Sequence, residues 1–203
     1  MSVRHFILAG LLAVGSAAPL AVASGAHAVT VFSDNFNADT NGLNQTIFVG
    51  GWTVANGTVD LIGAPPPFFD FIPGNGHYVD LDGSTGNAGE FTKDLVLTGG
   101  VAYTASFQLA GSHRGSSETV DVSFGTTLAT FTLASADGLG TQTLVFTPSA
   151  TGTFSLTFAN QGGDNVGALL DNVVVSTPEP STYALMLAAI AGIGFGARRR
   201  TQR

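Results

Sequence analysis

Residues 103–109 read Tyr-Thr-Ala-Ser-Phe-Gln-Leu, and they are the clearest indication of the fold class. Apolar and polar side chains alternate at every position, as expected of a β-strand with one buried face and one face in water. The same alternation recurs in residues 120–124, 129–133 and 154–158. Gly, Asn, Asp and Pro separate such runs at intervals of about ten residues, which is typical of turns between short strands.

Other short runs rich in Val, Thr and Phe extend this pattern along the chain. The further candidate strands are residues 30–36, 51–55, 58–62, 77–81, 90–97, 143–146 and 169–175. About ten strands in about 150 residues, with no helical pattern between them, predict an all-β body built as a two-sheet antiparallel sandwich. We expect the jelly-roll topology, although the periodicity also allows an immunoglobulin-like sandwich.

The N-terminal segment has the layout of a secretory signal peptide. Arg4 and His5 precede an apolar run at residues 6–14, and Ala-His-Ala at residues 26–28 provides a cleavage site between small residues. We therefore assign residues 1–28 to a signal peptide.

The C-terminal segment combines a rigid tripeptide, an apolar stretch and a cationic end. Pro178, Glu179 and Pro180 precede residues 181–197, which carry no charge. As a helix, this stretch would reach about 25 Å, the short end of a membrane span. The arginines that follow it would remain on the cytoplasmic side of the membrane. These basic residues are Arg198, Arg199 and Arg200.

The order of these features resembles the PEP-CTERM sorting signal of exported bacterial proteins. The resemblance implies partners in the export machinery and an exosortase-type membrane protease that cuts near the tripeptide. It also implies transient membrane contact through a single transmembrane-type sorting helix at residues 181–197. We expect a β-sandwich domain at 29–177 and a sorting signal at 178–203, in a protein of the cell surface, extracellular matrix or medium of a Gram-negative-type bacterium.

The body between the two ends is strongly acidic. All fourteen Asp and Glu residues lie between Asp34 and Glu179, whereas Lys93 and Arg114 are the only basic residues in 29–177. Such a surface repels phosphate backbones, so we expect no nucleic-acid partner. It suits divalent cations or neutral polymers, unless the acidity only maintains solubility. The sequence has no cysteine, which excludes disulfides and thiol catalysis.

Short motifs of the body resemble the galactose-binding-like jelly rolls of carbohydrate-binding modules. They are Asp-Asn-Phe-Asn at residues 34–37, Gly-Trp at 51–52 and Leu-Asp-Asn-Val-Val-Val at 170–175. The resemblance implies that the first and last strands lie close together, with a structural Ca²⁺ beside them. It also makes extracellular polysaccharide a candidate partner.

The residues themselves favour oxygen ligation of Ca²⁺ near the first strand. Asp171 shares the parity of apolar neighbours, and a buried carboxylate needs a counter-charge or several donors. Asp34, Asn35 and Asp39 offer the hard oxygen ligands that Ca²⁺ requires. Alternatively, Asp171 caps backbone amides at a bulge, and Asp34 and Asp39 are solvated turn residues.

The loop at residues 63–76 is the first candidate ligand-binding segment. Its prolines stiffen it, and Phe68, Phe69 and Phe71 stand outside any strand alternation. Exposed aromatic rings can stack on sugars or on a partner protein, but such rings also fold back and plug one end of a sandwich. Trp52, the only tryptophan, is either a sugar platform or a core residue.

Asp80 and Asp82 form the second candidate ligand-binding pair. Their spacing puts both carboxylates on one side of a strand end, where they would bind a cation or sugar hydroxyls, or cap the turn at 83–89. No motif of an enzyme active site is present, so we expect no catalytic activity. We expect an exported matrix-associated or polysaccharide-associated protein, with a self-assembling surface protein without a glycan ligand as the alternative.

Overall fold

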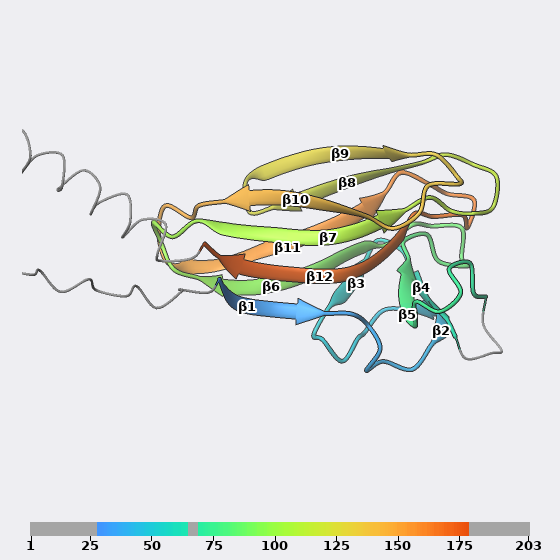
Figure 1. The fold of residues 1–203 in the computed structure, drawn as a ribbon, viewed down its shortest axis with the longest axis horizontal. Coiled ribbons are helices and arrows are strands. Elements are labelled where there is room, and N and C mark those ends of the chain that lie inside the picture. The colour runs from blue at the N-terminus through green and yellow to red at the C-terminus, as the bar shows by residue number, and fades with distance from the viewer. Residues whose placement is uncertain (1–27, 65–68, 179–203) are drawn as a thin grey trace, which may run out of the picture.

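The computed structural model describes residues 28–64 and 69–178, which form strands and loops and contain no helix (Figure 1). The strands are β1 (Val29–Asp34), β2 (Gly42–Gln45), β3 (Thr53–Ala55), β4 (Val59–Gly63), β5 (His77–Asp80), β6 (Glu90–Leu97), β7 (Tyr103–Ala110), β8 (Glu118–Phe124), β9 (Thr127–Leu133), β10 (Gly140–Phe146), β11 (Gly152–Asn160) and β12 (Leu169–Thr177).

The strands pair into two antiparallel sheets that pack face to face (Figure 1). The first sheet has the order β10-β7-β12-β5-β4-β2, with β1 also paired to β12, and the second has the order β3-β6-β11-β8-β9. The eight strands from β5 to β12 are distributed as 5-12-7-10 and 6-11-8-9. This is the order of two interleaved Greek keys, so the jelly-roll prediction is confirmed over the immunoglobulin-like alternative.

The side chains of the strands are buried and exposed in turn, as the alternation predicts. Along β7, Ala105, Phe107 and Leu109 are buried, while the polar residues between them are half-exposed. The structure differs from the prediction at the first strand, which ends at Asp34 instead of residue 36. Phe36 has a φ of 56°, and its N–H is bound by Asp34 Oδ1 at 2.8 Å, so the backbone turns there.

Aromatic side chains fill the core between the sheets. Trp52 is 1% exposed and lies parallel to Phe91, with the ring centroids 4.4 Å apart. Phe32 meets the same indole edge-on at 5.6 Å. A smaller apolar cluster lies around Ile62, Tyr78, Ala110 and Leu169, where Phe71 and Ile72 of the loop after β4 pack against it.

Both ends of the described chain leave the sandwich at the same pole (Figure 1). β1 pairs with β12 antiparallel, with Val29 opposite Thr177. The predicted signal peptide, apart from Ala28, and the sorting segment from Glu179 lie outside the described residues. Within 28–64 and 69–178, no helix is long and apolar enough to cross a membrane.

Candidate functional site: a seam cavity and an aromatic loop

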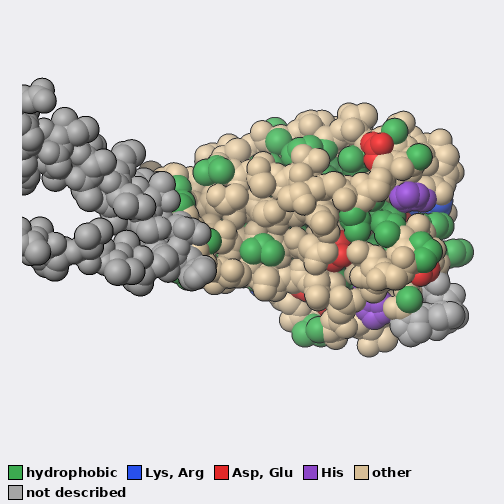
Figure 2. Space-filling model, viewed as in Figure 1, with side chains coloured by type: hydrophobic (Ala, Val, Ile, Leu, Met, Phe, Trp, Pro, Cys, Tyr) green, Lys and Arg blue, Asp and Glu red, His purple; other side chains and the backbone are tan. Residues whose placement is uncertain are grey.

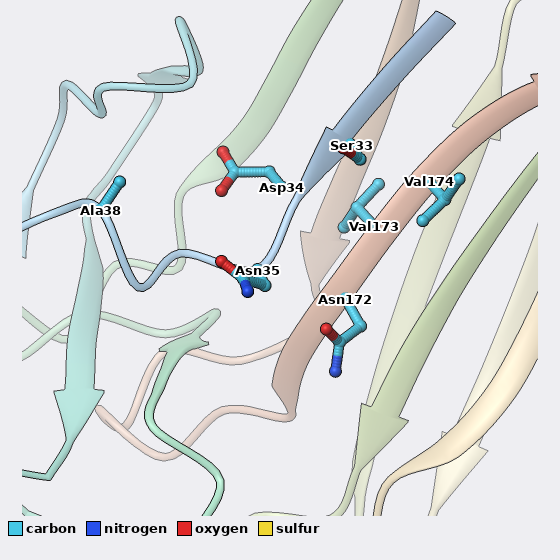
Figure 3. Close-up of a pocket in the computed structure, with 7 residues that line it drawn as sticks. All are labelled: Ser33, Asp34, Asn35, Ala38, Asn172, Val173 and Val174. Atoms are coloured by element: carbon cyan, nitrogen blue, oxygen red, sulfur yellow. The ribbon is translucent and has the colours of Figure 1, made fainter. Parts of the chain in front are cut away.

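A cavity of about 400 Å³ opens where β1 ends beside β12 (Figure 3). The lining residues from β1 and the turn after it are Ser33, Asp34, Asn35 and Ala38, and those from β12 are Asn172, Val173 and Val174. The volume suits a small ligand or one unit of a polymer. Apart from Asp34, the polar lining consists of uncharged amides and a hydroxyl, which are groups that hydrogen-bond neutral ligands.

An irregularity in β12 produces this opening. The register with β7 shifts between Asp171 and Val174, and Asn172 has a φ of 50°. A bulge leaves residues unpaired and redirects their side chains. Asn172 is consequently exposed, and its Nδ2 donates to Gln108 Oε1 at 2.7 Å.

Asp171 lies inside the same bulge and is buried, as its parity predicted. Its carboxylate accepts hydrogen bonds from the Asn172 N–H at 2.7 Å, Asn172 Nδ2 at 2.9 Å and Asn75 Nδ2 at 2.7 Å. Burial raises the pKa of Asp171, while the Asn75 and Asn172 donors oppose that shift. Several donors thus occupy the carboxylate, as the bulge-capping alternative requires.

The other three predicted calcium ligands are also engaged by the protein. Asp34 binds the Phe36 N–H, and its Oδ2 accepts from Trp52 Nε1 at 3.0 Å. Asn35 accepts from the Asn37 N–H, and Asp39 from the Val49 N–H. Among residues 28–64 and 69–178, no three acidic or histidine side chains converge as a metal-binding group. Asp34 and Asp171 are nevertheless close enough for the Asp34 charge to contribute to the raised pKa of Asp171.

The aromatic loop stands over the outer side of the same sheet. Phe69 is 61% exposed, and its ring lies parallel to Phe71 with the centroids 5.9 Å apart. Phe71 packs on the small cluster that contains Leu169, and the guanidinium of Arg114 lies 5.4 Å from its ring centroid. Phe71 therefore folds back onto the sheet, whereas Phe69 is presented to solvent. Phe68 lies outside the described residues.

For Trp52, the structure corrects the prediction of a sugar platform. Its indole is buried in the core and its N–H is used by Asp34, so it presents no platform to a sugar. The Gly-Trp motif alone did not decide between a sugar platform and a core position, because a single strand residue can face either way.

Asp80 and Asp82 are a second correction, because they are 2% and 0% exposed and so offer no surface to a ligand. Asp80 forms an ion pair with Arg114, which also donates to the Asn165 carbonyl at 2.7 Å. Asp82 Oδ2 accepts from the Gly163 N–H at 3.0 Å. The pair therefore braces the loops at the pole opposite the chain ends, and the turn at 83–89 is held instead by Asp60, which binds Ser84.

Burial controls the protonation of this buried pair. It raises the pKa of Asp80 to about 8, against the opposing attraction of Arg114. Burial also raises the pKa of Asp82, while backbone N–H groups of Asp164 and Gly163 lower it. The loop that carries Arg114 and the turn at Gly163 thus rest on carboxylates whose pKa values are raised by burial.

No pattern in the sequence indicated that Asn172, Asn75 or Arg114 belongs to this region. Asn172 followed Asp171 in the motif, but only its positive φ turns it towards the cavity. Asn75 and Asp171 are 96 residues apart, and Arg114 and Asp80 are 34 residues apart. The fold brings such pairs together, so no fixed spacing in the sequence predicts them.

Comparison with known protein families identifies the C-terminal end. The profile of the PEP-CTERM protein-sorting motif matches residues 176–200. The chain carries a PEP-CTERM sorting motif. The match includes Pro178-Glu179-Pro180 and the three arginines, and its first two residues are the last two of β12. The motif indicates export, sorting at the cell surface of a Gram-negative bacterium and processing by an exosortase. No curated protein matches the sequence.

Several solved structures resemble the sandwich at low identity. The CBM22-1 and GH10 modules of a Clostridium thermocellum xylanase, complexed with xylohexaose, share 14% identity at a TM-score of 0.49, over 74% of this chain and 29% of that one. A CBM22-1 xylan-binding domain from Paenibacillus barcinonensis shares 14% at 0.47, over 77% and 99%. An adhesin domain of Lys-gingipain from Porphyromonas gingivalis shares 15% at 0.49, over 74% and 99%. At these scores the likenesses carry no argument about a ligand.

Proposed function

We propose that this chain is an exported surface or matrix protein whose sandwich holds a neutral polysaccharide on the outer side of the β12 sheet. The observation that carries the proposal is the exposed ring of Phe69, held parallel to Phe71 above the sheet. Among the large apolar side chains that are exposed in the described residues, Phe69 is the only aromatic one. A flat apolar ring at the surface is the group on which a sugar ring can stack.

β12 connects the aromatic loop with the seam cavity. Leu169 lies beneath Phe71, Asp171 is bound by Asn75 of the same loop, and Asn172 lines the cavity. Amide and hydroxyl groups there would hydrogen-bond sugar hydroxyls. The protein's acidity is no obstacle, because a neutral polymer is not repelled by carboxylates.

We predict that Phe69→Ala lowers the affinity for a responsive glycan about tenfold, because loss of an aromatic contact costs about 1 kcal/mol or more. Binding of the intact protein to a panel of soluble xylans, glucans and galactans would be measured by calorimetry. Phe69→Tyr keeps the ring and should retain the affinity. Ile47→Ala removes an exposed apolar side chain outside the loop and is the matched control.

Absence of binding across the panel, or equal affinities for Phe69→Ala and the parent, would reject the glycan proposal. Concentration-dependent assembly without glycan binding would favour the self-assembling surface protein instead.

A structural Ca²⁺ belongs to the same proposal, at the seam beside Asp34 and Asp171. A cation there would offset the repulsion between the two carboxylates. Because Asp34 binds the indole of Trp52, ligation at Asp34 should change the fluorescence of this single tryptophan. We predict a Ca²⁺-dependent change in emission and a melting temperature several degrees lower after chelation. Asp171→Asn should lose both responses, and a parent protein indifferent to Ca²⁺ in both measurements would exclude the ion.

A further inference from the structure

Charged side chains are confined to one part of the sandwich. The strand ends and loops at the pole where the chain's ends leave contain no Asp, Glu, Lys, Arg or His. We call this surface the terminal pole; it comprises residues 29–33, 95–104, 122–128, 144–153 and 173–178. On the face shown in Figure 2, acidic, basic and histidine side chains lie away from the grey tails, while green apolar groups continue up to them.

Large aliphatic side chains are exposed on the terminal pole. They are Val29 (55%), Val31 (45%), Val96 (80%), Leu128 (68%) and Val145 (56%). Val29 and Val145 belong to one sheet, and Val96 and Leu128 to the other. A protein docked against one sheet would cover only part of this set, whereas a planar surface that meets the sandwich end-on can contact all of it.

The chain leaves the terminal pole towards its apolar segment almost immediately. Thr177 is the last residue of β12, and the uncharged stretch begins at Ser181. Four residue steps span at most about 14 Å. The headgroup layer of a bilayer is only about 5–8 Å thick on each side of its hydrocarbon core. A sandwich tethered in this way has its terminal pole at the membrane surface.

We propose that the terminal pole is a lipid-contacting surface, which docks the sandwich upright on the outer side of the membrane while residues 181–197 are inserted. The inference rests on the exported, sorted state described above. Aliphatic side chains gain free energy at the boundary between headgroups and acyl chains, and the absence of acidic residues avoids repulsion by anionic lipids. The aromatic loop at the opposite pole then faces away from the membrane.

Single-cysteine labelling tests this proposal directly, because the chain has no cysteine of its own. Val96→Cys, Leu128→Cys and Val145→Cys would each carry an environment-sensitive fluorophore in the full chain, in phosphatidylcholine–phosphatidylglycerol vesicles with nitroxide-labelled lipid. We expect a blue shift and quenching at all three positions. Thr132→Cys is the matched control, because Thr132 is exposed on the same strand as Leu128 but at its other end; it should show neither effect.

A further label at Leu187→Cys distinguishes a failure of the docking surface from a failure of the tail to insert into the membrane. Quenching at 187 without quenching at the terminal pole overturns the docking surface alone. Absence of quenching at 187 also removes the premise that the tail inserts, whereas the glycan measurements on Phe69 are independent of both. If the effects at the pole weaken when protein is diluted in lipid at constant nitroxide content, the occupant is a second copy and the proposal is wrong.

Introduction of negative charge at the terminal pole gives a second readout. Val96→Asp together with Leu128→Asp should abolish quenching at position 145, because a carboxylate at the headgroup boundary costs free energy. Unchanged Trp52 emission would show that the fold is intact. Persistent quenching at 145 in that variant contradicts the proposal.

Discussion

Replacement of Trp52 by alanine is expected to lower the free energy of unfolding by about 3–5 kcal/mol. The indole is buried, stacks on Phe91 and donates its N–H to Asp34. Alanine would leave a cavity between the sheets and an Asp34 oxygen without its donor. Urea unfolding followed by far-ultraviolet circular dichroism measures the loss, since the variant has no tryptophan.

Trp52→Phe divides this effect into its parts. It keeps an aromatic ring against Phe91 but removes the N–H, so its cost should be clearly smaller than that of alanine. Val96→Ala trims an exposed aliphatic side chain and should leave stability unchanged. A loss below about 1 kcal/mol for Trp52→Ala would contradict the core position, because full burial of a large side chain contributes more than this.

Removal of Arg114 is expected to destabilise the protein, and to do so most strongly at alkaline pH. The Arg114→Ala variant leaves Asp80 buried without its cation, so the pKa of Asp80 should rise further, and the variant should lose about 1.4 kcal/mol relative to the parent for each pH unit above the parent's pKa. Because burial raises the pKa of Asp80 to about 8, the group is protonated at pH 5 and charged at pH 9. The cost of the substitution should therefore be large at pH 9 and small at pH 5.

The same buried carboxylates determine how the stability of the parent protein changes with pH. Asp80, Asp82 and Asp171 all have pKa values raised by burial, so the folded state binds more protons than the unfolded state. Stability then falls as the pH rises from about 4, where unfolded carboxyls titrate, to about 8, where folded Asp80 titrates. Thermal unfolding between pH 4 and pH 9 measures this slope, and Asp80→Asn should flatten it.

A matched double variant isolates the ion pair. Asp80→Asn combined with Arg114→Ala removes both charges, so its stability should exceed that of Arg114→Ala at pH 9. An Arg114→Ala cost that does not change with pH would mean that Asp80 is not the group titrating in this range.

Strand alternation predicted most of the fold. The apolar parity of β7 and β11 made their inward faces readable from the sequence. β2 was missed, because Gly-Leu-Asn-Gln shows no alternation and is instead held through the Asn44 N–H bound by Asp60 at 2.7 Å. A short edge strand of this kind depends on a partner distant in sequence.

The site was less predictable than the fold. Parity placed Asp171 in the interior, yet its donor Asn75 became visible only in the structure. Asp80 looked available to a ligand at a strand end, but the loop that carries Arg114 covers it. In each case, loops that the topology brings together set the environment of a polar side chain. The local spacing of residues does not predict which loops these are.

The pairing of β12 with both β1 and β7 has a mechanical consequence. A protein held at its C-terminal end and loaded through a ligand at the opposite pole is pulled along the strands. Antiparallel hydrogen bonds lie perpendicular to that direction, so they are loaded in shear and share the force. Extraction of β12 would require its ladders with β1, β7 and β5 to rupture together instead of unzipping one bond at a time. In the proposed membrane-attached, glycan-bound state, β12 would be the strand that carries this tension.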